Sequence, residues 1–160
     1  MNIGKVFEDE IKKSIPDTHF KYRFKDGTGA WGGSDKTRFQ SHNICDYEVM
    51  WNKYLFLLEL KTHKGKSIPF NCLREKQIKE MESASKYLNV KPYFIFNFRD
   101  LELTYAIKAT DIAFYIRTSD KKSFSLLWCS SHGFEIKSKK SRTRYTYDME
   151  SFFNYIERSE

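Results

Sequence analysis

The sequence is poor in the residues that build disulfide frameworks and zinc sites. It has three cysteines, an odd number without a Cys-x-x-Cys spacing, and four histidines without a His-Glu-x-x-His pair. A disulfide scaffold and a zinc site are therefore not expected. The chain also lacks an apolar run long enough to span a membrane, and its first residues do not read as a signal peptide. These absences predict a cytoplasmic protein.

Acidic residues are in the minority. Lys and Arg number 28 against 21 Asp and Glu, which gives a formal net charge of +7. A basic surface either binds a polyanion such as a nucleic acid or only keeps the protein in solution. Hydrophobic residues make up 40% of the 160 residues, and aromatic residues 17%. This is enough apolar surface for one compact domain over residues 1–160, and it argues against a disordered chain.

Glycine is scarce except in one stretch. Four of the seven glycines lie between Asp26 and Asp35, where regular structure is not expected. We therefore predict a mobile loop or a protruding arm over about residues 25–42. Trp31 in its centre either stacks on a base or wedges into a nucleic-acid junction, or it folds back as a lid on the core.

Charged residues interrupt two segments that otherwise have the pattern of buried strands. Asp46 lies near the start of the segment 44–51, and a second segment begins with the apolar run 54–58. Glu59 and Lys61 follow that run, and the alternation of a strand places them on the same face. The link between the segments is short and polar, which predicts an antiparallel hairpin that brings Asp46 towards Glu59.

Two carboxylates this close repel each other unless a cation separates them. Oxygen ligands with open positions suit Mg²⁺ or Mn²⁺, and a metal held there activates a water for phosphodiester hydrolysis. Lys61 would orient or help deprotonate that water, or steady the developing negative charge. The alternative is a strand end that reaches solvent, with Glu59 and Lys61 as an ordinary exposed pair.

Beyond these segments the chain alternates between helix and strand patterns. Helices are predicted over residues 4–14 and 71–88 and from Thr110 and Asp148 onward, and strands over residues 19–24, 91–98 and 101–107. This order predicts an α/β fold with a central mixed sheet and helices on both sides. We expect Phe114 to be among the buried residues of the helix that begins at Thr110.

One polar residue interrupts the apolar stripe of the predicted helix 71–88. The stripe consists of Leu73, Gln77, Met81, Ala84 and Leu88. An amide on an apolar face needs a hydrogen-bond partner. Gln77 either approaches the metal site or the DNA backbone, or it lies capped at the edge of the stripe.

The most basic segment lies near the C-terminus, at about residues 137–147. Five positive charges fall within eight residues there, at Lys137, Lys139, Lys140, Arg142 and Arg144. Two tyrosines follow, at positions 145 and 147. Basic residues beside aromatic ones fit a contact with a phosphate backbone. The alternative is a solvated, flexible basic loop.

Taken together, these motifs resemble those of the RecU-type Holliday-junction resolvases, including phage-encoded members, in the PD-(D/E)xK nuclease superfamily. The resemblance begins with Gly4-Lys5-Val6-Phe7-Glu8, which is similar to an N-terminal Gly-Lys-x-Phe-Glu in that family. It continues with Asp46-Tyr47 and Glu59-Leu60-Lys61, similar to the family's Asp-Tyr and Glu-x-Lys, and ends with Pro69-Phe70 and Gln77. It covers about residues 4–100.

The resemblance implies a restriction-endonuclease-like fold and a homodimer that cuts four-way DNA junctions symmetrically with Mg²⁺, or with Mn²⁺ as a substitute. The protein would act in the cytoplasm of a bacterial cell or of a phage-infected bacterial cell. Carried over by position, the catalytic side chains are Asp46, Glu59, Lys61, Glu8 and Gln77. We expect Asp46, Glu59 and the Leu60 carbonyl to hold the metal, and the products to carry 5′-phosphates.

Residues 25–42 occupy the place of the family's stalk, which enters the junction centre. Their expected DNA contacts are Trp31, Lys36 and Arg38. This arm is glycine-rich and shorter than the cellular family's stalk, and Ile44 replaces a threonine that the family has before its metal-binding Asp.

Three other functions fit parts of the pattern. The first is a flap- or sequence-specific endonuclease of the same superfamily, and the second is a branched-DNA-binding protein without catalysis. An RNA-binding module is the third, although the sequence has no aromatic pattern typical of one.

Overall fold

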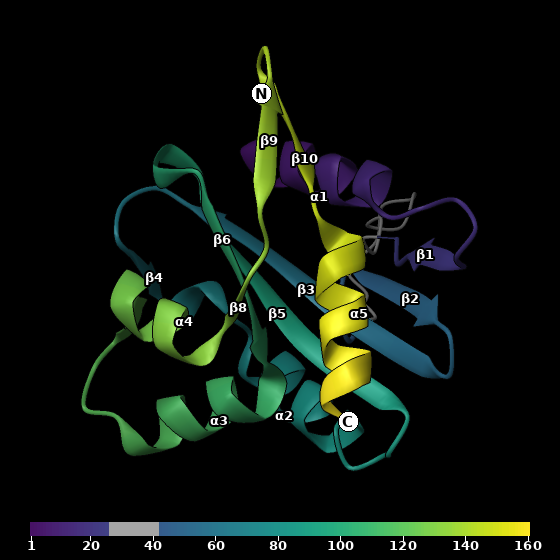
Figure 1. Cartoon of the computed structure of the whole chain (residues 1–160). Helices are drawn as coiled ribbons and strands as arrows, with labels where there is room; N and C mark the ends of the chain where they lie inside the picture. Colours follow the sequence, from purple (N-terminus) through teal and green to yellow (C-terminus); the bar gives the residue numbers. More distant parts are fainter. Residues whose placement is uncertain (26–41) are drawn as a thin grey trace, which may run out of the picture.

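The computed structural model describes residues 1–25 and 42–160. The predicted arm, about residues 25–42, therefore lies almost entirely outside the described residues, and so do its expected DNA contacts Trp31, Lys36 and Arg38. In the described part of the chain, helices pack around a central sheet (Figure 1). None of these helices is both long and apolar enough to cross a membrane.

The central sheet has six strands in the order β1-β2-β3-β5-β6-β8. Its middle strands, β3 (Tyr54–His63) and β5 (Val90–Phe98), pair in parallel, and the outer pairs are antiparallel. The outer strands are β1 (Lys21–Arg23), β2 (Tyr47–Trp51), β6 (Leu103–Lys108) and β8 (Phe134–Glu135). The predicted mixed sheet is confirmed, and its two apolar central strands are covered on both faces, as their composition requires.

Helices α1 (Ile3–Ser14) and α5 (Met149–Ser159) pack on one face of the sheet. Their buried residues, among them Phe7 and Phe152, form one core with the side chains of β3 such as Phe56. Helices α2 (Glu75–Ala84), α3 (Ala109–Thr118) and α4 (Leu126–His132) pack on the other face. Their core includes Met81 and the β5 residue Phe96. The predicted α/β architecture with helices on both sides is thus confirmed.

Two small sheets complete the fold. Strand β4 (Ser67–Pro69) pairs with β7 (Ser123–Ser125), and β9 (Ser138–Ser141) pairs with β10 (Arg144–Tyr147). The basic segment is therefore not a loop, because most of it forms the β9–β10 hairpin. Short 3-10 helices span Phe70–Cys72 and Arg99–Leu101.

The prediction of one helix over residues 71–88 was wrong. A 3-10 turn occupies its beginning, Leu73 is extended with φ −106° and ψ 141°, and α2 forms only from Glu75 to Ala84. The apolar stripe therefore ends early, and Leu88 lies beyond the helix with 83% of its surface exposed. Phe114 was also expected to be buried, but it lies on the outer side of α3 and is 62% exposed.

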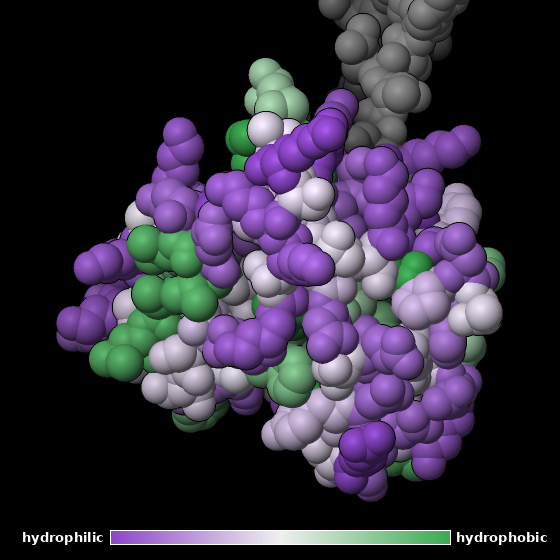
Figure 2. Space-filling model, turned by 45° about the horizontal axis from the view of Figure 1, so that its top comes forward, coloured by the Kyte–Doolittle hydropathy of each residue, from purple (hydrophilic) through white to green (hydrophobic). Residues whose placement is uncertain are grey.

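Hydrophilic side chains cover most of the face seen in Figure 2, while hydrophobic ones gather at its left, the side on which α3 and α4 lie in Figure 1. The exposed apolar residues of these two helices are Phe114 and Leu127. The polar remainder agrees with the basic composition of the chain.

Candidate active site

A cleft opens at the edge of the sheet where β2 begins and β3 ends. Its volume is about 830 Å³. Its walls come from the first turn of α1, the segment before β2, the end of β3 and the start of α2. The lining residues include Asn2, Ile3, Gly4, Glu8, His42, Asn43, Cys45, Asp46, Glu59, Leu60, Lys61, Thr62, His63, Lys64, Arg74, Gln77 and Arg99.

The β2–β3 hairpin sets the position of the two acids in this cleft. Asn52 in its two-residue turn has a φ of 50°, a left-handed conformation that asparagine tolerates. The antiparallel register places Tyr47 opposite Leu58, so Asp46 comes opposite Glu59 one residue before β2 begins. This is the arrangement that the short link between the two segments predicted.

The Asp46 side chain takes the place of one backbone acceptor opposite β3. The Asp46 N–H donates to the Leu58 carbonyl at 3.0 Å, and its Oδ2 accepts the Leu60 N–H at 2.7 Å. The expected strand over residues 44–51 therefore begins only at Tyr47, because the carboxyl group takes the place of the next backbone acceptor. In an extended strand the N–H and C=O of one residue point the same way, so the Leu60 carbonyl faces the Asp46 side.

Glu59 is buried, with only 2% of its surface exposed. Its Oε1 lies 2.8 Å from Lys61 Nζ, and its Oε2 accepts a hydrogen bond from Gln77 Nε2 at 2.8 Å. The interpretation of Glu59 and Lys61 as an ordinary exposed pair is therefore wrong for Glu59. Gln77, the polar member of the α2 stripe, is directed at this carboxylate instead of lying capped at the edge of the stripe.

Burial changes the acidity of both carboxyl groups. Desolvation, with repulsion from Asp46, raises the pKa of Glu59 to about 8, although Lys61 opposes the shift. Desolvation also raises the pKa of Asp46. Because the pKa of Glu59 lies near 8, the pair without a metal carries less than two negative charges near neutral pH.

The donor set fits a hard divalent cation. Asp46 and Glu59 supply carboxylate oxygens, and Leu60 supplies a carbonyl on the same side. Over residues 1–25 and 42–160, no group of three or more His, Cys, Asp and Glu side chains converges as a metal site. Magnesium commonly binds through one or two carboxylates and keeps its other positions for water and substrate phosphates, which agrees with this sparse set.

Two other predicted residues lie in the same cleft with different partners. Gln77 Oε1 is buried without a hydrogen-bond partner, so it is free to accept a bond from a water or a ligand. Glu8 of α1 receives two bonds at its Oε2 from Arg23, at 2.8 Å from Nε and 2.6 Å from Nη2. Glu8 is thus held by Arg23, although its charge still acts on Asp46.

Sequence reasoning missed the basic rim of the cleft. Lys64 and Arg99 follow the ends of β3 and β5, whose parallel register pairs residue 63 with residue 98. Arg74 precedes α2, and its Nη1 lies 3.2 Å from His42 Nδ1. A prediction that β3 pairs in parallel with β5 would have brought Lys64 and Arg99 together, since adjacent parallel strands end at the same edge of a sheet. Nothing in the sequence singled out Arg74.

The five basic residues chosen from the C-terminal segment do not line the cleft. Lys137, Lys139, Lys140, Arg142 and Arg144 are all exposed, and they lie on or beside the β9–β10 hairpin. This hairpin packs against α1 (Figure 1), the helix whose first turn forms one wall of the cleft.

Known proteins share both the sequence pattern and the fold. The family model described as "RecU: Recombination protein U" matches residues 10–149. The SPbeta prophage-derived uncharacterized protein YotM of Bacillus subtilis (strain 168) is 33% identical over 162 residues, which span 91% of this chain and 82% of that protein.

A solved structure with a similar fold is that of Hjc, a Holliday junction resolvase from the archaeal hyperthermophile Archaeoglobus fulgidus. It matches with a TM-score of 0.51 at 12% identity, over 82% of this chain and 93% of that one. At this identity the likeness shows the fold, and it agrees with the expected nuclease-like sheet. With a family match over most of its length and a prophage relative at 33% identity, the chain belongs to the RecU family.

Proposed function

We propose that this protein is a metal-dependent endonuclease that resolves four-way DNA junctions by symmetric phosphodiester hydrolysis. The observation that carries the proposal is the pair formed by Asp46 and Glu59, two acids that the β2–β3 hairpin brings into one cleft, with Lys61 bound to Glu59. Membership of the RecU family and the resolvase-like fold support a junction as the substrate.

In this proposal Asp46, Glu59 and the Leu60 carbonyl hold Mg²⁺, with Mn²⁺ as a substitute. When bound there, the metal would lower the pKa of a water and neutralise charge on the scissile phosphate. Lys61 carries an ammonium next to Glu59, where it orients the attacking water or stabilises the developing charge. Hydrolysis that expels the 3′-oxygen leaves 5′-phosphate ends.

Two further residues would position this machinery. Gln77 fixes the Glu59 carboxylate through its Nε2 and leaves its Oε1 free towards the cleft. Glu8 supports the site from α1 by its charge while Arg23 holds it in place. Neither residue needs to touch the scissile phosphate, so both act on catalysis through the groups they orient.

DNA would enter over the basic rim and extend onto the basic hairpin. The rim supplies Lys64, Arg74 and Arg99 within the cleft. The arm residues Trp31, Lys36 and Arg38 are proposed as further contacts at the junction centre. The net charge of +7 favours association with the phosphates of DNA.

The test is a cleavage assay on a labelled immobile four-way junction and a duplex of equal length, with Mg²⁺ and then with EDTA. We expect paired, symmetric nicks with 5′-phosphate ends in the junction, lost with EDTA and absent from the duplex. Equal cutting of both substrates would keep the nuclease and discard the resolvase. Tight junction binding without cutting would instead indicate a binding protein.

A further inference from the structure

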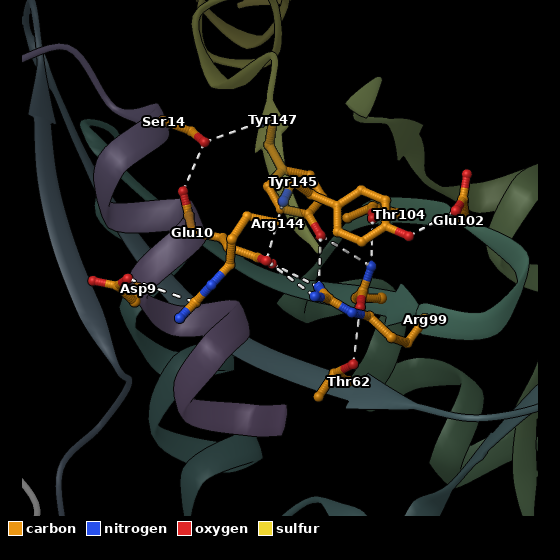
Figure 3. Close-up of polar contacts among 11 residues, drawn as sticks. Asp9, Glu10, Ser14, Thr62, Arg99, Glu102, Thr104, Arg144, Tyr145 and Tyr147 are labelled. Atoms are coloured by element: carbon orange, nitrogen blue, oxygen red, sulfur yellow. Dashed lines mark hydrogen bonds and ion pairs between the residues drawn. The ribbon is translucent and has the colours of Figure 1, made fainter. Parts of the chain in front are cut away.

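The β9–β10 hairpin is attached to α1 by backbone hydrogen bonds to polar side chains. Tyr145 N–H donates to Glu10 Oε1 at 3.1 Å, and Tyr147 N–H donates to Ser14 Oγ at 2.9 Å. The Ser14 hydroxyl in turn donates to the Glu10 carbonyl at 2.7 Å. Figure 3 shows these contacts in a row along one side of α1. They fix the direction in which β10 leaves the body of the protein.

A buried ion pair completes the attachment. Glu10 is 3% exposed and receives two bonds from Arg99, at 2.6 Å from Nη1 and 3.0 Å from Nη2. The Arg99 guanidinium also lies 4.5 Å from the centre of the Tyr145 ring (Figure 3). Arg99 lines the cleft as well. The same side chain therefore contacts both the candidate active site and the hairpin, and it sets one relative to the other.

The five cations of the segment fall into two classes. Three of them pair with acids of the protein: Lys137 with Glu135 at 2.6 Å, Lys140 with Glu102 at 2.9 Å and Arg144 with Asp9 at 3.8 Å. The other two, Lys139 and Arg142, form no ion pair with any residue of the described ranges 1–25 and 42–160. The sequence alone does not distinguish these five cations, but in the structure they differ in how much of their charge is available to a ligand.

The hairpin register separates Lys140 from Lys139. Lys140 lies opposite Tyr145, on the face that packs against the body, and the Tyr145 hydroxyl shares Glu102 with it. Lys139 lies opposite Thr146, on the other face, where both side chains are exposed. Arg142 occupies the turn with a φ of 57°, at the tip of the hairpin. One cation thus points outward from the strand and another stands at the tip.

We propose that the hairpin is a preformed DNA-backbone contact in which Lys139 and Arg142 bind phosphates, while the charges of Lys137, Lys140 and Arg144 are partly neutralised by Glu135, Glu102 and Asp9. The partner is an arm of the branched DNA that the cleft cuts, so this inference rests on the proposed function. We choose a phosphate backbone as the ligand because the two cations are exposed, unpaired and beside a cleft proposed to cut a phosphodiester. Such cations add to the affinity for DNA without reading its sequence.

The test compares two double variants that remove the same charge from the same hairpin. One is Lys139→Gln with Arg142→Gln, and the control is Lys137→Gln with Lys140→Gln. All four side chains are exposed, so both proteins should fold, and a thermal melt checks this. Binding to the four-way junction is measured in EDTA, where no cutting occurs, at several salt concentrations.

We expect the Lys139/Arg142 variant to raise the Kd for the junction on the order of tenfold and to lower the slope of log Kd against log salt by about two. The Lys137/Lys140 control should change Kd by less than about threefold, because its cations are partly neutralised by their acid partners. Equal losses in both variants would overturn the proposal, since net charge alone would then account for binding. Unchanged binding in both would overturn it too.

The cleavage assay separates this failure from that of the proposed function. If the wild-type protein cuts junctions but the two variants bind alike, only the role of the hairpin is wrong. If the wild-type protein binds the four-way junction no more tightly than the duplex, the proposal of a branched substrate is wrong.

Discussion

Glu59 is a buried acid that lies beside a second acid, Asp46, and this makes the metal-free protein sensitive to pH. Its pKa rises from 4.5 to about 8, so between these values the folded state binds more protons than the unfolded state. The free energy of unfolding should therefore fall as pH rises through this range, by an amount of a few kcal/mol. Thermal unfolding in EDTA at pH 5.5 and pH 8 measures the difference.

The control for this pH effect is Glu59→Gln, which keeps the size of the side chain and removes the titration. Its melting temperature should change less between the two pH values than that of the wild-type protein. Added Mg²⁺ should restore more stability to the wild-type protein at pH 8 than at pH 5.5, because it replaces a bound proton. Equal pH dependence in both proteins would show that Glu59 is not the titrating group.

Catalysis should depend on both carboxylates, and binding should not. Asp46→Asn and Glu59→Gln each remove a proposed metal ligand without changing the shape of the cleft, so cutting should fall by at least about a thousandfold. Junction affinity in EDTA should stay within a fewfold of the wild-type value. Cutting that survives either substitution would refute the assignment of the site, whereas a loss of affinity in EDTA would point to misfolding.

The sequence predicted most of this site because its signal is local. A short hairpin link and a charged residue in each strand are enough to place Asp46 beside Glu59, and a lone amide on an apolar stripe marks Gln77. The partners of Glu8 and Glu10 were beyond reach, because Arg23 and Arg99 meet them only through tertiary packing. Sequence spacing carries no signal for the contacts that α1 makes with β1 or with the 3-10 helix Arg99–Leu101.

At the scale of elements, Glu10 is the residue on which the hairpin most depends. Glu10→Gln leaves the Arg99 guanidinium without its buried carboxylate, and breaking such a pair costs about 3–5 kcal/mol. The substitution also weakens the acceptor of the Tyr145 N–H. We expect a lower melting temperature and faster amide exchange across β9 and β10 than in the wild-type protein.

A matched control is Glu102→Gln, which changes an exposed acid that contacts the same hairpin through Lys140 and Tyr145. Exposed pairs contribute little to stability because water and salt screen them. The control should therefore melt close to the wild-type protein and keep slow exchange in β10. If both variants loosen the hairpin alike, the buried pair is not its main attachment.

The hairpin also shows where element prediction fails. Strand β9 (Ser-Lys-Lys-Ser) has no apolar residue, and the two tyrosines of β10 alternate over only four residues, so no strand was predicted there. Tyr145 and Tyr147, read as DNA contacts beside the basic run, are half-buried and buried in the structure and attach the hairpin to the body. In the same way the helix expected over residues 71–88 broke at Leu73, because helical spacing of apolar residues does not report a 3-10 turn that precedes it.

For the whole molecule, the proposed reaction sets a requirement on assembly. A four-way junction has two-fold symmetry, and paired incisions in opposite strands need two active sites held on one DNA molecule. Each chain offers one pair of the proposed acids, Asp46 and Glu59. We therefore expect a homodimer, with a sedimentation mass twice that of the chain at the concentrations used for cleavage.

A mixing experiment joins this assembly to function. Wild-type protein exchanged with an excess of Glu59→Gln should yield mixed dimers that hold one intact site. On a supercoiled plasmid that extrudes a cruciform, paired incisions give a linear product and a single incision gives a nicked circle. The mixture should therefore give nicked circles in place of linear product, because a mixed dimer occupies the junction and cuts only one strand. A linear product that persists in proportion to total cutting, or a monomeric mass, would show that the sites act independently.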